Sequence, residues 1–126
     1  MQKIIIHDPT LRDGNHAVRH QLTAEQIKIY ARAANNANIP ILEVGHGNGL
    51  GASSLQVGLS RETDRVMLET AKSQLTNKKL GVHCIPGFAT RNRDIDLALD
   101  CGVDVFRIAS HVTEANVTKD HIAYVR

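Results

Sequence analysis

Ile41-Leu42-Glu43-Val44-Gly45 is the stretch that decides the fold, because it has the pattern of a buried strand with a carboxylate at its centre. In an open parallel sheet that is covered on both faces, strands are nearly all apolar. Val105-Phe106-Arg107-Ile108-Ala109 repeats the pattern with a guanidinium group. Near the carboxyl-terminal mouth of a (β/α)8 barrel such charges are tolerated, because the active site lies there. The two stretches therefore favour a barrel over a doubly wound sheet.

Around these stretches the chain alternates between predicted strands and predicted helices. The strands are predicted at 3–7, 41–45, 80–85 and 103–109, and the helices at 23–37, 62–76, 92–101 and from 113 to the end. Strict alternation implies parallel strands with helical crossovers. Four such units are half of the roughly 250 residues of a (β/α)8 barrel. We therefore expect an α/β chain in which residues 1–126 form the N-terminal half of a single TIM-barrel domain, truncated from a longer protein.

Several residues mark where the helices begin and end. Thr23, followed by Gln26 three residues later, predicts a capping box at the start of the first helix. Thr90 and Thr113 are expected as N-caps of the third and fourth helices. Gly102 stands where a helix end in the left-handed conformation is expected.

Composition excludes several classes of function. The chain has 42% hydrophobic and 22% charged residues and a net charge of +2, the balance of a soluble globular protein. Its Lys and Arg residues form no stripe, and aromatic residues make up only 3%, which argues against nucleic-acid binding. The three isoleucines after Met1-Gln2-Lys3 are far too short an apolar run for a signal peptide or a membrane span. Cys84 and Cys101 form no CxxC motif, so we expect reduced thiols in a cytoplasmic protein.

The densest polar stretch follows the first predicted strand and runs from His7 to His20. Within it, Arg12, Asp13 and His16 supply an anion-stabilising group, a ligand for a hard metal ion and a proton shuttle. Loops that follow barrel strands are where such groups belong. On spacing alone, a polar surface loop with a local Arg–Asp pair is an equal alternative.

Three motifs carry a resemblance to a known family. Thr-Leu-Arg-Asp-Gly at 10–14 resembles the signature of the DRE-TIM metallolyases, which include isopropylmalate synthase and hydroxymethylglutaryl-CoA lyase. Within that superfamily, residues 8–20, 43–54 and 107–117 resemble the 4-hydroxy-2-oxovalerate aldolases, which are class II pyruvate aldolases. The motifs have matching order and spacing, and the resemblance covers essentially the whole chain.

The resemblance implies a role for each residue of the first motif. Asp13 would be a ligand of a divalent metal ion, Mn2+ before Mg2+ or Co2+, and with Arg12 it would bind the substrate. Arg12 would stabilise the pyruvate enolate that forms when 4-hydroxy-2-oxovalerate is split into pyruvate and acetaldehyde. His16 would take the proton of the 4-hydroxyl group. A histidine with an ordinary pKa near 6.5 suits this task.

The resemblance also implies groups outside this sequence. Such aldolases complete the metal site with a His-x-His pair, which would lie beyond residue 126, and no His-x-His occurs here. We therefore expect the chain alone to be inactive. By analogy, the whole enzyme would act in the catabolism of aromatic compounds and pair with an acylating acetaldehyde dehydrogenase.

Other polar residues in strands admit two interpretations. Glu43 and Arg107 are expected either to form a strut inside the barrel or to orient catalytic groups, and the strut is favoured. His46, His83 and His111 allow a rival metal site with Asp13, although isolated histidines near strand ends more often serve the structure. The glycine-rich loop at 45–54 fits neither a dinucleotide fingerprint nor a P-loop. The resemblance implies instead that it lines the mouth of the barrel.

Two other functions stay open. One is a Claisen-type acyl-CoA synthase or lyase of the same superfamily, against which His16 and the loop at 45–54 argue. The other is a non-catalytic half-barrel that binds a partner or forms a homo-oligomer, since four parallel strands leave two open edges.

Overall fold

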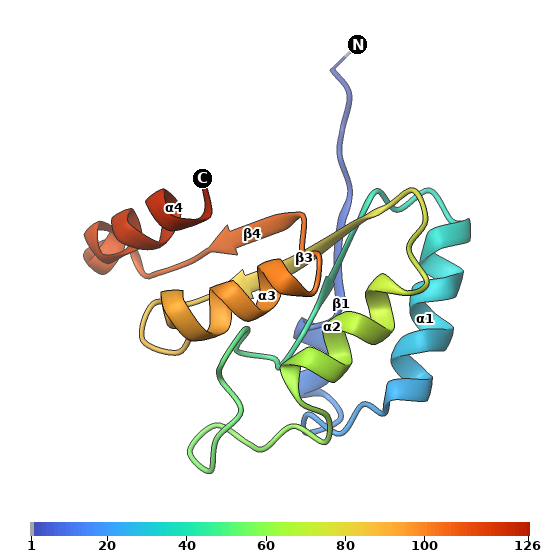
Figure 1. Ribbon diagram of the computed structural model, residues 1–126, viewed down its shortest axis with the longest axis horizontal. Coiled ribbons are helices and arrows are strands. Elements are labelled where there is room, and N and C mark those ends of the chain that lie inside the picture. The colour runs from blue at the N-terminus through green and yellow to red at the C-terminus, as the bar shows by residue number, and fades with distance from the viewer. Residues whose placement is uncertain (1) are drawn as a thin grey trace.

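A parallel four-stranded sheet forms the centre of the computed structural model, which describes residues 2–126 (Figure 1). The strands lie side by side in chain order: β1 (His7–Leu11), β2 (Ile41–Val44), β3 (Lys79–Cys84) and β4 (Val105–Ile108). All three pairings are parallel, as crossover connections require. The expected α/β fold is confirmed, and four successive parallel strands are consistent with half of a barrel.

The helices follow the strands in turn. They are η1 (Asp13–His16), α1 (Ala24–Asn36), α2 (Asp64–Lys72), η2 (Arg91–Ile95), α3 (Asp96–Asp100), η3 (Val112–Thr118) and α4 (Lys119–Val125). Helices α1, α2 and α3 gather on one face of the sheet, and α4 lies beyond β4 (Figure 1). Among the described residues, no helix has both the length and the apolar character that a membrane span needs.

Of the helix caps predicted from the sequence, those of the first helix and the fourth helix differ in how well they agree with the structure. The capping box of α1 is confirmed: Thr23 Oγ1 accepts from the Gln26 amide at 3.1 Å, and Gln26 Oε1 accepts from the Thr23 amide at 2.9 Å. Gly102 follows α3 with a φ of +81°, as expected. Thr113 was predicted wrongly as an N-cap, because the fourth helix begins as the 3-10 turn η3, which follows His111.

The third helix also begins differently from the prediction. Its first turn, η2, is a π-helix that runs from Arg91 to Ile95. Thr90 stands at the N-cap position of this turn, as predicted, but its side chain accepts no capping hydrogen bond. Instead, the amide and the hydroxyl of Thr90 donate to Asp94 Oδ2 at 2.7 and 2.9 Å. The carboxylate of Asp94 therefore replaces the hydroxyl as the acceptor at this helix start.

The first strand was placed too early in the sequence. Ile4, Ile5 and Ile6 are exposed, Ile4 to 86%, and the strand is formed by the more polar residues that follow them. Its register with β2 shifts between Asp8 and Leu11. Pro9 lies in this irregular part, where a residue without an N–H group is tolerated. Leu11 reaches the hydrophobic core, and the three isoleucines do not.

The two faces of the sheet differ sharply in composition. The covered face packs against the helices and contributes Leu42, Val44, Leu80, Val82 and Cys84 to the hydrophobic core. Residues that alternate with these point to the other face, which we call the polar face: His7, Glu43, Gly81, His83 and Arg107. The polar side chains of this face come from all four strands, and His83 and Arg107 are direct register partners on β3 and β4.

Candidate active site

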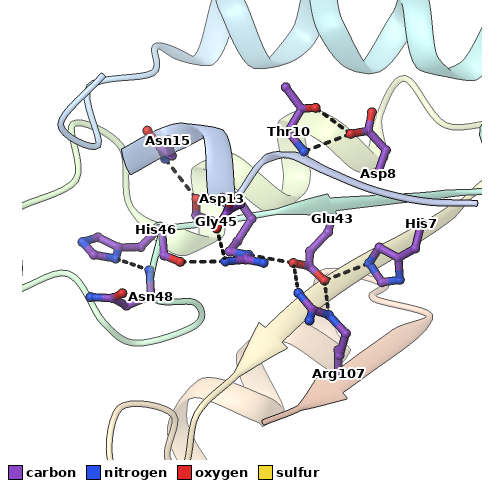
Figure 2. A network of polar contacts seen from close by, with 12 residues as sticks. His7, Asp8, Thr10, Asp13, Asn15, Glu43, Gly45, His46, Asn48 and Arg107 are labelled. Carbon is purple, nitrogen blue, oxygen red and sulfur yellow. Dashed lines mark hydrogen bonds and ion pairs between the residues drawn. The ribbon is translucent and has the colours of Figure 1, made fainter. Parts of the chain in front are cut away.

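Glu43 is the centre of the polar face. Its side chain is fully buried, and its two carboxylate oxygens accept from Arg12 Nε at 2.7 Å and from Arg107 Nη2 and Nε at 2.8 and 3.0 Å. Burial acts to raise the pKa of Glu43, but the hydrogen bonds and charges of Arg107 and Arg12 outweigh it and hold the pKa at about 2. Glu43 is therefore ionised and clamps both guanidinium groups (Figure 2).

His7 adds a third basic group to Glu43. Its Nε2 atom lies 2.8 Å from Glu43 Oε2, the distance of an ion pair, although it makes no hydrogen bond of good geometry there. A Cβ atom on Gly81 would lie 3.3 Å from the same nitrogen. The glycine thus leaves room for the imidazole ring beside the carboxylate.

Arg12 links this buried network to the loops at the end of the sheet. Its Nε atom is held by Glu43, while its Nη1 atom donates to Asp13 Oδ1 and to the carbonyl oxygen of Gly47, both at 3.0 Å. The side chain is mostly buried. A guanidinium group held at three points is oriented before any ligand arrives, which is what electrostatic stabilisation of an oxyanion requires.

The loop that bears these groups is pinned to its neighbour. Directly after β1 the chain turns into η1, and Asn15, fully buried there, donates from Nδ2 to the carbonyl oxygen of Gly45 at 2.9 Å. Together with the bond from Arg12 to Gly47, this contact ties the loop after β1 to the loop after β2. The sequence motif that begins at Thr10 is therefore hydrogen-bonded to the neighbouring loop through two buried side chains.

Asp13 and His16 lie at the two ends of η1 and both are exposed. Asp13 is 66% exposed in its side chain, so a carboxylate oxygen is accessible beside the Arg12 guanidinium. His16 lies near two other imidazole rings, with ring centroids 5.1 Å from His20 and 6.5 Å from His46. The structure thus brings a guanidinium, a carboxylate and an imidazole to one end of the sheet.

A shallow hollow of about 430 Å³ opens on this side of the molecule. It is lined by His7, Pro9, Arg12, Asp13 and Arg107. Its wall combines a guanidinium pair with a carboxylate, so it can accept the charged end of a small oxoacid. Arg107 reaches the hollow from β4, 64 residues along the chain from its partner Glu43.

A metal ion is only partly accommodated by these residues. Within residues 2–126, no three His, Cys, Asp or Glu side chains approach closely enough to hold one. Asp13 can supply one carboxylate ligand, whereas a Mn2+ or Mg2+ ion needs about six ligands. The rival site built from His46, His83 and His111 with Asp13 was therefore a wrong prediction for the part of the chain that the structure describes.

Each of those three histidines has another environment. His46 is buried, accepts from the Asn48 amide through Nδ1 at 3.0 Å and lies 2.9 Å from the Gly58 carbonyl oxygen through Nε2. His111 is exposed before η3. His83 is 9% exposed on the polar face, and its Nδ1 atom has no hydrogen-bond partner among the described residues. Burial, helped by the positive charges of Arg12 and Arg107, lowers the pKa of His83 to about 4.

The contacts of Glu43 are compatible with both interpretations of the Glu43–Arg107 pair. The strut across the strands exists, and the same carboxylate also holds the guanidinium of Arg12 at 2.7 Å; a catalytic role for Arg12 stays a prediction. Sequence reasoning missed His7, Asn15 and His20. All three are polar residues within or shortly after the first strand, in the stretch from 7 to 20, and this position could have identified them. Spacing along the sequence does not show which residue each side chain contacts.

Nearly the whole chain is similar to known proteins. The sequence pattern of the HMGL-like family matches residues 3–124. A 4-hydroxy-2-oxovalerate aldolase of Spirochaeta aurantia is 59% identical over 123 residues, which cover 98% of this chain and 36% of that protein. 4-Hydroxy-2-oxovalerate aldolase 2 of Salinispora arenicola (strain CNS-205) is 57% identical over 124 residues, with the same two coverages.

A more distant relative shows the same pattern. The 4-hydroxy-2-oxovalerate aldolase of Streptomyces griseus is 50% identical over 126 residues, which cover 100% of this chain and 37% of that protein. The chain thus spans a little over a third of the length of the curated relatives that it matches. Arg12, Asp13 and the loop at 45–54 lie inside the matched region.

Proposed function

Because this chain belongs to the HMGL-like family, we propose that it carries the acid–base and enolate-binding part of a carbon–carbon lyase that splits 4-hydroxy-2-oxovalerate into pyruvate and acetaldehyde. Relatives that are 50–59% identical bear the name of this aldolase. The observation that carries the proposal is the clamped guanidinium of Arg12, which lies 3.0 Å from the exposed carboxylate of Asp13.

Cleavage begins with removal of a proton. In the proposed reaction the imidazole of His16 takes the proton from the hydroxyl group on C4, and the C4–oxygen bond becomes a carbonyl as the C3–C4 bond breaks. The electron pair of that bond moves into the pyruvyl fragment, which leaves as an enolate. Acetaldehyde is the other product, and protonation of the enolate at C3 gives pyruvate.

The negative charge of the enolate explains why Arg12 is held so firmly. A guanidinium that is already oriented stabilises the developing charge without reorganising when the bond breaks. Glu43 prevents it from turning away, and Arg107 keeps the carboxylate of Glu43 ionised. The negative charge of Glu43 also partly neutralises the two guanidinium groups. On this proposal the hollow therefore does not bind pyruvate too tightly to release it.

We further propose a requirement for a divalent metal ion, with Mn2+ preferred over Mg2+ and Co2+. Asp13 supplies one carboxylate ligand, and groups outside residues 2–126 supply the others. When bound, such an ion provides a positive charge for the pyruvyl oxygens. On this proposal the chain by itself releases no pyruvate, because the larger share of the ligands is not among its residues.

The biological setting is proposed from the same chemistry. Acetaldehyde is reactive, so an acylating aldehyde dehydrogenase is the partner that would consume it, and the setting would be the catabolism of aromatic compounds in the cytoplasm. The alternative Claisen-type activity is less well supported. The relatives named above bear the aldolase name at up to 59% identity.

Pyruvate release from 4-hydroxy-2-oxovalerate tests the proposal. The full-length protein with Mn2+ should release pyruvate, and His16→Ala and Asp13→Ala should each reduce kcat by at least about 10²-fold. Leu55→Ala is the matched control, because Leu55 is 90% exposed and distant from Arg12 in the sequence. Unchanged kcat in both active-site variants would overturn the proposal.

A further inference from the structure

Gly47 contacts three of the side chains that surround the proposed reaction. Its carbonyl oxygen accepts from Arg12 Nη1 at 3.0 Å, and its amide donates to His20 Nδ1 at 3.2 Å. A Cβ atom built on Gly47 would lie within 3.0 Å of three ring atoms of His16, closer than real carbon atoms pack. The imidazole of His16 therefore occupies the space that a side chain at position 47 would need.

Space, and not backbone conformation, explains why glycine stands at this position. Gly45 and Gly49, on either side, have φ angles of +150° and +91°, which favour glycine for conformational reasons. Gly47 is not among the residues with positive φ. An alanine at position 47 would thus be free to adopt the same backbone, and its methyl group would displace the His16 ring.

The peptide unit of Gly47 is itself held by a pair of stacked imidazoles. His20 and His46 lie with ring centroids 3.6 Å apart and planes 13° from parallel. Each ring accepts a backbone hydrogen bond through Nδ1, His20 from Gly47 and His46 from Asn48. Both Nδ1 atoms are therefore unprotonated, and the rings are neutral. Burial lowers the pKa of both histidines, which agrees with a stack of two neutral rings.

We propose that Gly47 is a positioning residue for the reaction, whose peptide unit, held by the stacked pair His20 and His46, sets the guanidinium of Arg12 and the imidazole of His16 in a fixed relation. The inference rests on the proposed function for its catalytic meaning. Its physical content is independent, because it says where the His16 ring lies. Loss of this placement moves the base away from the hydroxyl proton and leaves the binding of the oxoacid largely intact.

A cycle of Gly47→Ala and His16→Ala in the full-length protein tests the placement. Gly47→Ala alone should lower kcat for pyruvate release by about 10²-fold, with KM changed less than about threefold. In the His16→Ala background, Gly47→Ala should lower kcat by less than about threefold, because no imidazole ring is left at position 16 for the methyl group to displace. Leu55→Ala is again the control, since the Leu55 side chain is 90% exposed and its truncation imposes no backbone strain.

The histidine ring resonances in an NMR spectrum of the same protein supply a readout that does not depend on activity. Gly47→Ala should shift the His16 and His20 ring signals, and Leu55→Ala should leave them in place. His20→Asn and His20→Leu form a second pair: asparagine can still accept from the Gly47 amide and tolerates the φ of +61° at position 20, whereas leucine cannot accept. The asparagine variant should keep most of the kcat that the leucine variant loses.

Three outcomes would overturn the proposal: equal costs of Gly47→Ala with and without His16, His16 resonances that do not move, or equal kcat values for the two His20 variants. Failure of the proposed function would look different. It would leave His16→Ala with unchanged pyruvate release, while the ring resonances would still report whether Gly47 places the His16 ring.

Discussion

The covered face and the polar face of the sheet are built from alternate residues of the same strands, yet they serve different ends. On β2, Leu42 points to the helices and is fully buried among apolar groups, and its neighbour Glu43 points the other way and is fully buried among cations. The first contact is satisfied by any side chain of the right volume. The second needs particular groups at particular distances. Two equally buried residues can therefore have different roles: one stabilises the fold, and the other holds polar groups of the candidate site in place.

Glu43→Ala should have the largest effect on stability, because it leaves two guanidinium groups without their carboxylate. Breaking a buried ion pair by removing one partner costs about 3–5 kcal/mol. Chemical denaturation of the chain, followed by circular dichroism, measures the loss. A loss under about 1 kcal/mol would mean that the polar face does not depend on this network, and the contrast between the faces would be weaker than described.

Leu42→Ala should come second and act on the covered face alone. Removing a buried leucine side chain costs about 2–5 kcal/mol through lost burial and the cavity left behind. Ile4→Ala is the matched control, since Ile4 is 86% exposed and its change should stay within about 0.5 kcal/mol. Similar losses in the two variants would contradict the placement of the first strand after Ile6.

Acid should destabilise the chain partly through His83. Its pKa of about 4 in the folded state lies below the usual 6.5, so the unfolded state takes up the proton first as the pH falls. The destabilisation begins near pH 6.5 and reaches roughly 3 kcal/mol below pH 4. Glu43, with a folded pKa of about 2, adds a further loss below its usual pKa of 4.5.

Denaturation midpoints of the parent chain and His83→Leu between pH 7 and pH 4 separate the two contributions. The leucine variant should lose less stability over this range than the parent does, since it has no imidazole to protonate. Identical pH profiles would show that the His83 ring is not held neutral on the polar face.

Thr23→Ala should have the smallest effect of the series. Loss of an N-cap costs about 1 kcal/mol, and here the reciprocal bond from Gln26 loses its geometry as well. Thr113→Ala is the control, because Thr113 caps no helix and its replacement should change the unfolding free energy by less than about 0.5 kcal/mol. A cost at position 113 equal to that at position 23 would argue against the structure of η3.

Local signals in the sequence predicted the parts of the fold that local chemistry controls. The capping box at Thr23 and the helix end at Gly102 were read correctly, because each depends on residues within one turn. Three of the four strands were also found. The run from Ile4 to Ile6 led to a wrong placement of the first strand, because three consecutive isoleucines have a stronger strand propensity than a segment that contains Pro9. Only the pairing with β2 shows which segment enters the sheet.

The sequence predicted which residues belong to the candidate site, but it did not predict which side chains contact one another. Arg12, Asp13 and His16 stood out as residue types, and the resemblance to known aldolases gave them roles. Contacts across 31 and 64 residues, which join Glu43 to Arg12 and Arg107, depend on strand register. The role of Gly47 was hidden for another reason: a residue without a side chain gives no signal of what fills the space beside it.

Exchange of the methyl protons of pyruvate in deuterium oxide tests the central claim most directly, because it reports enolate formation without the aldehyde. With Mn2+ present, the full-length protein should exchange these protons, and Arg12→Lys should slow the exchange by about 10²–10³-fold. Leu42→Ala, on the covered face, should exchange at the parent rate wherever it is folded. An Arg12→Lys protein that exchanges as fast as its parent would contradict the account that the polar face stabilises the enolate.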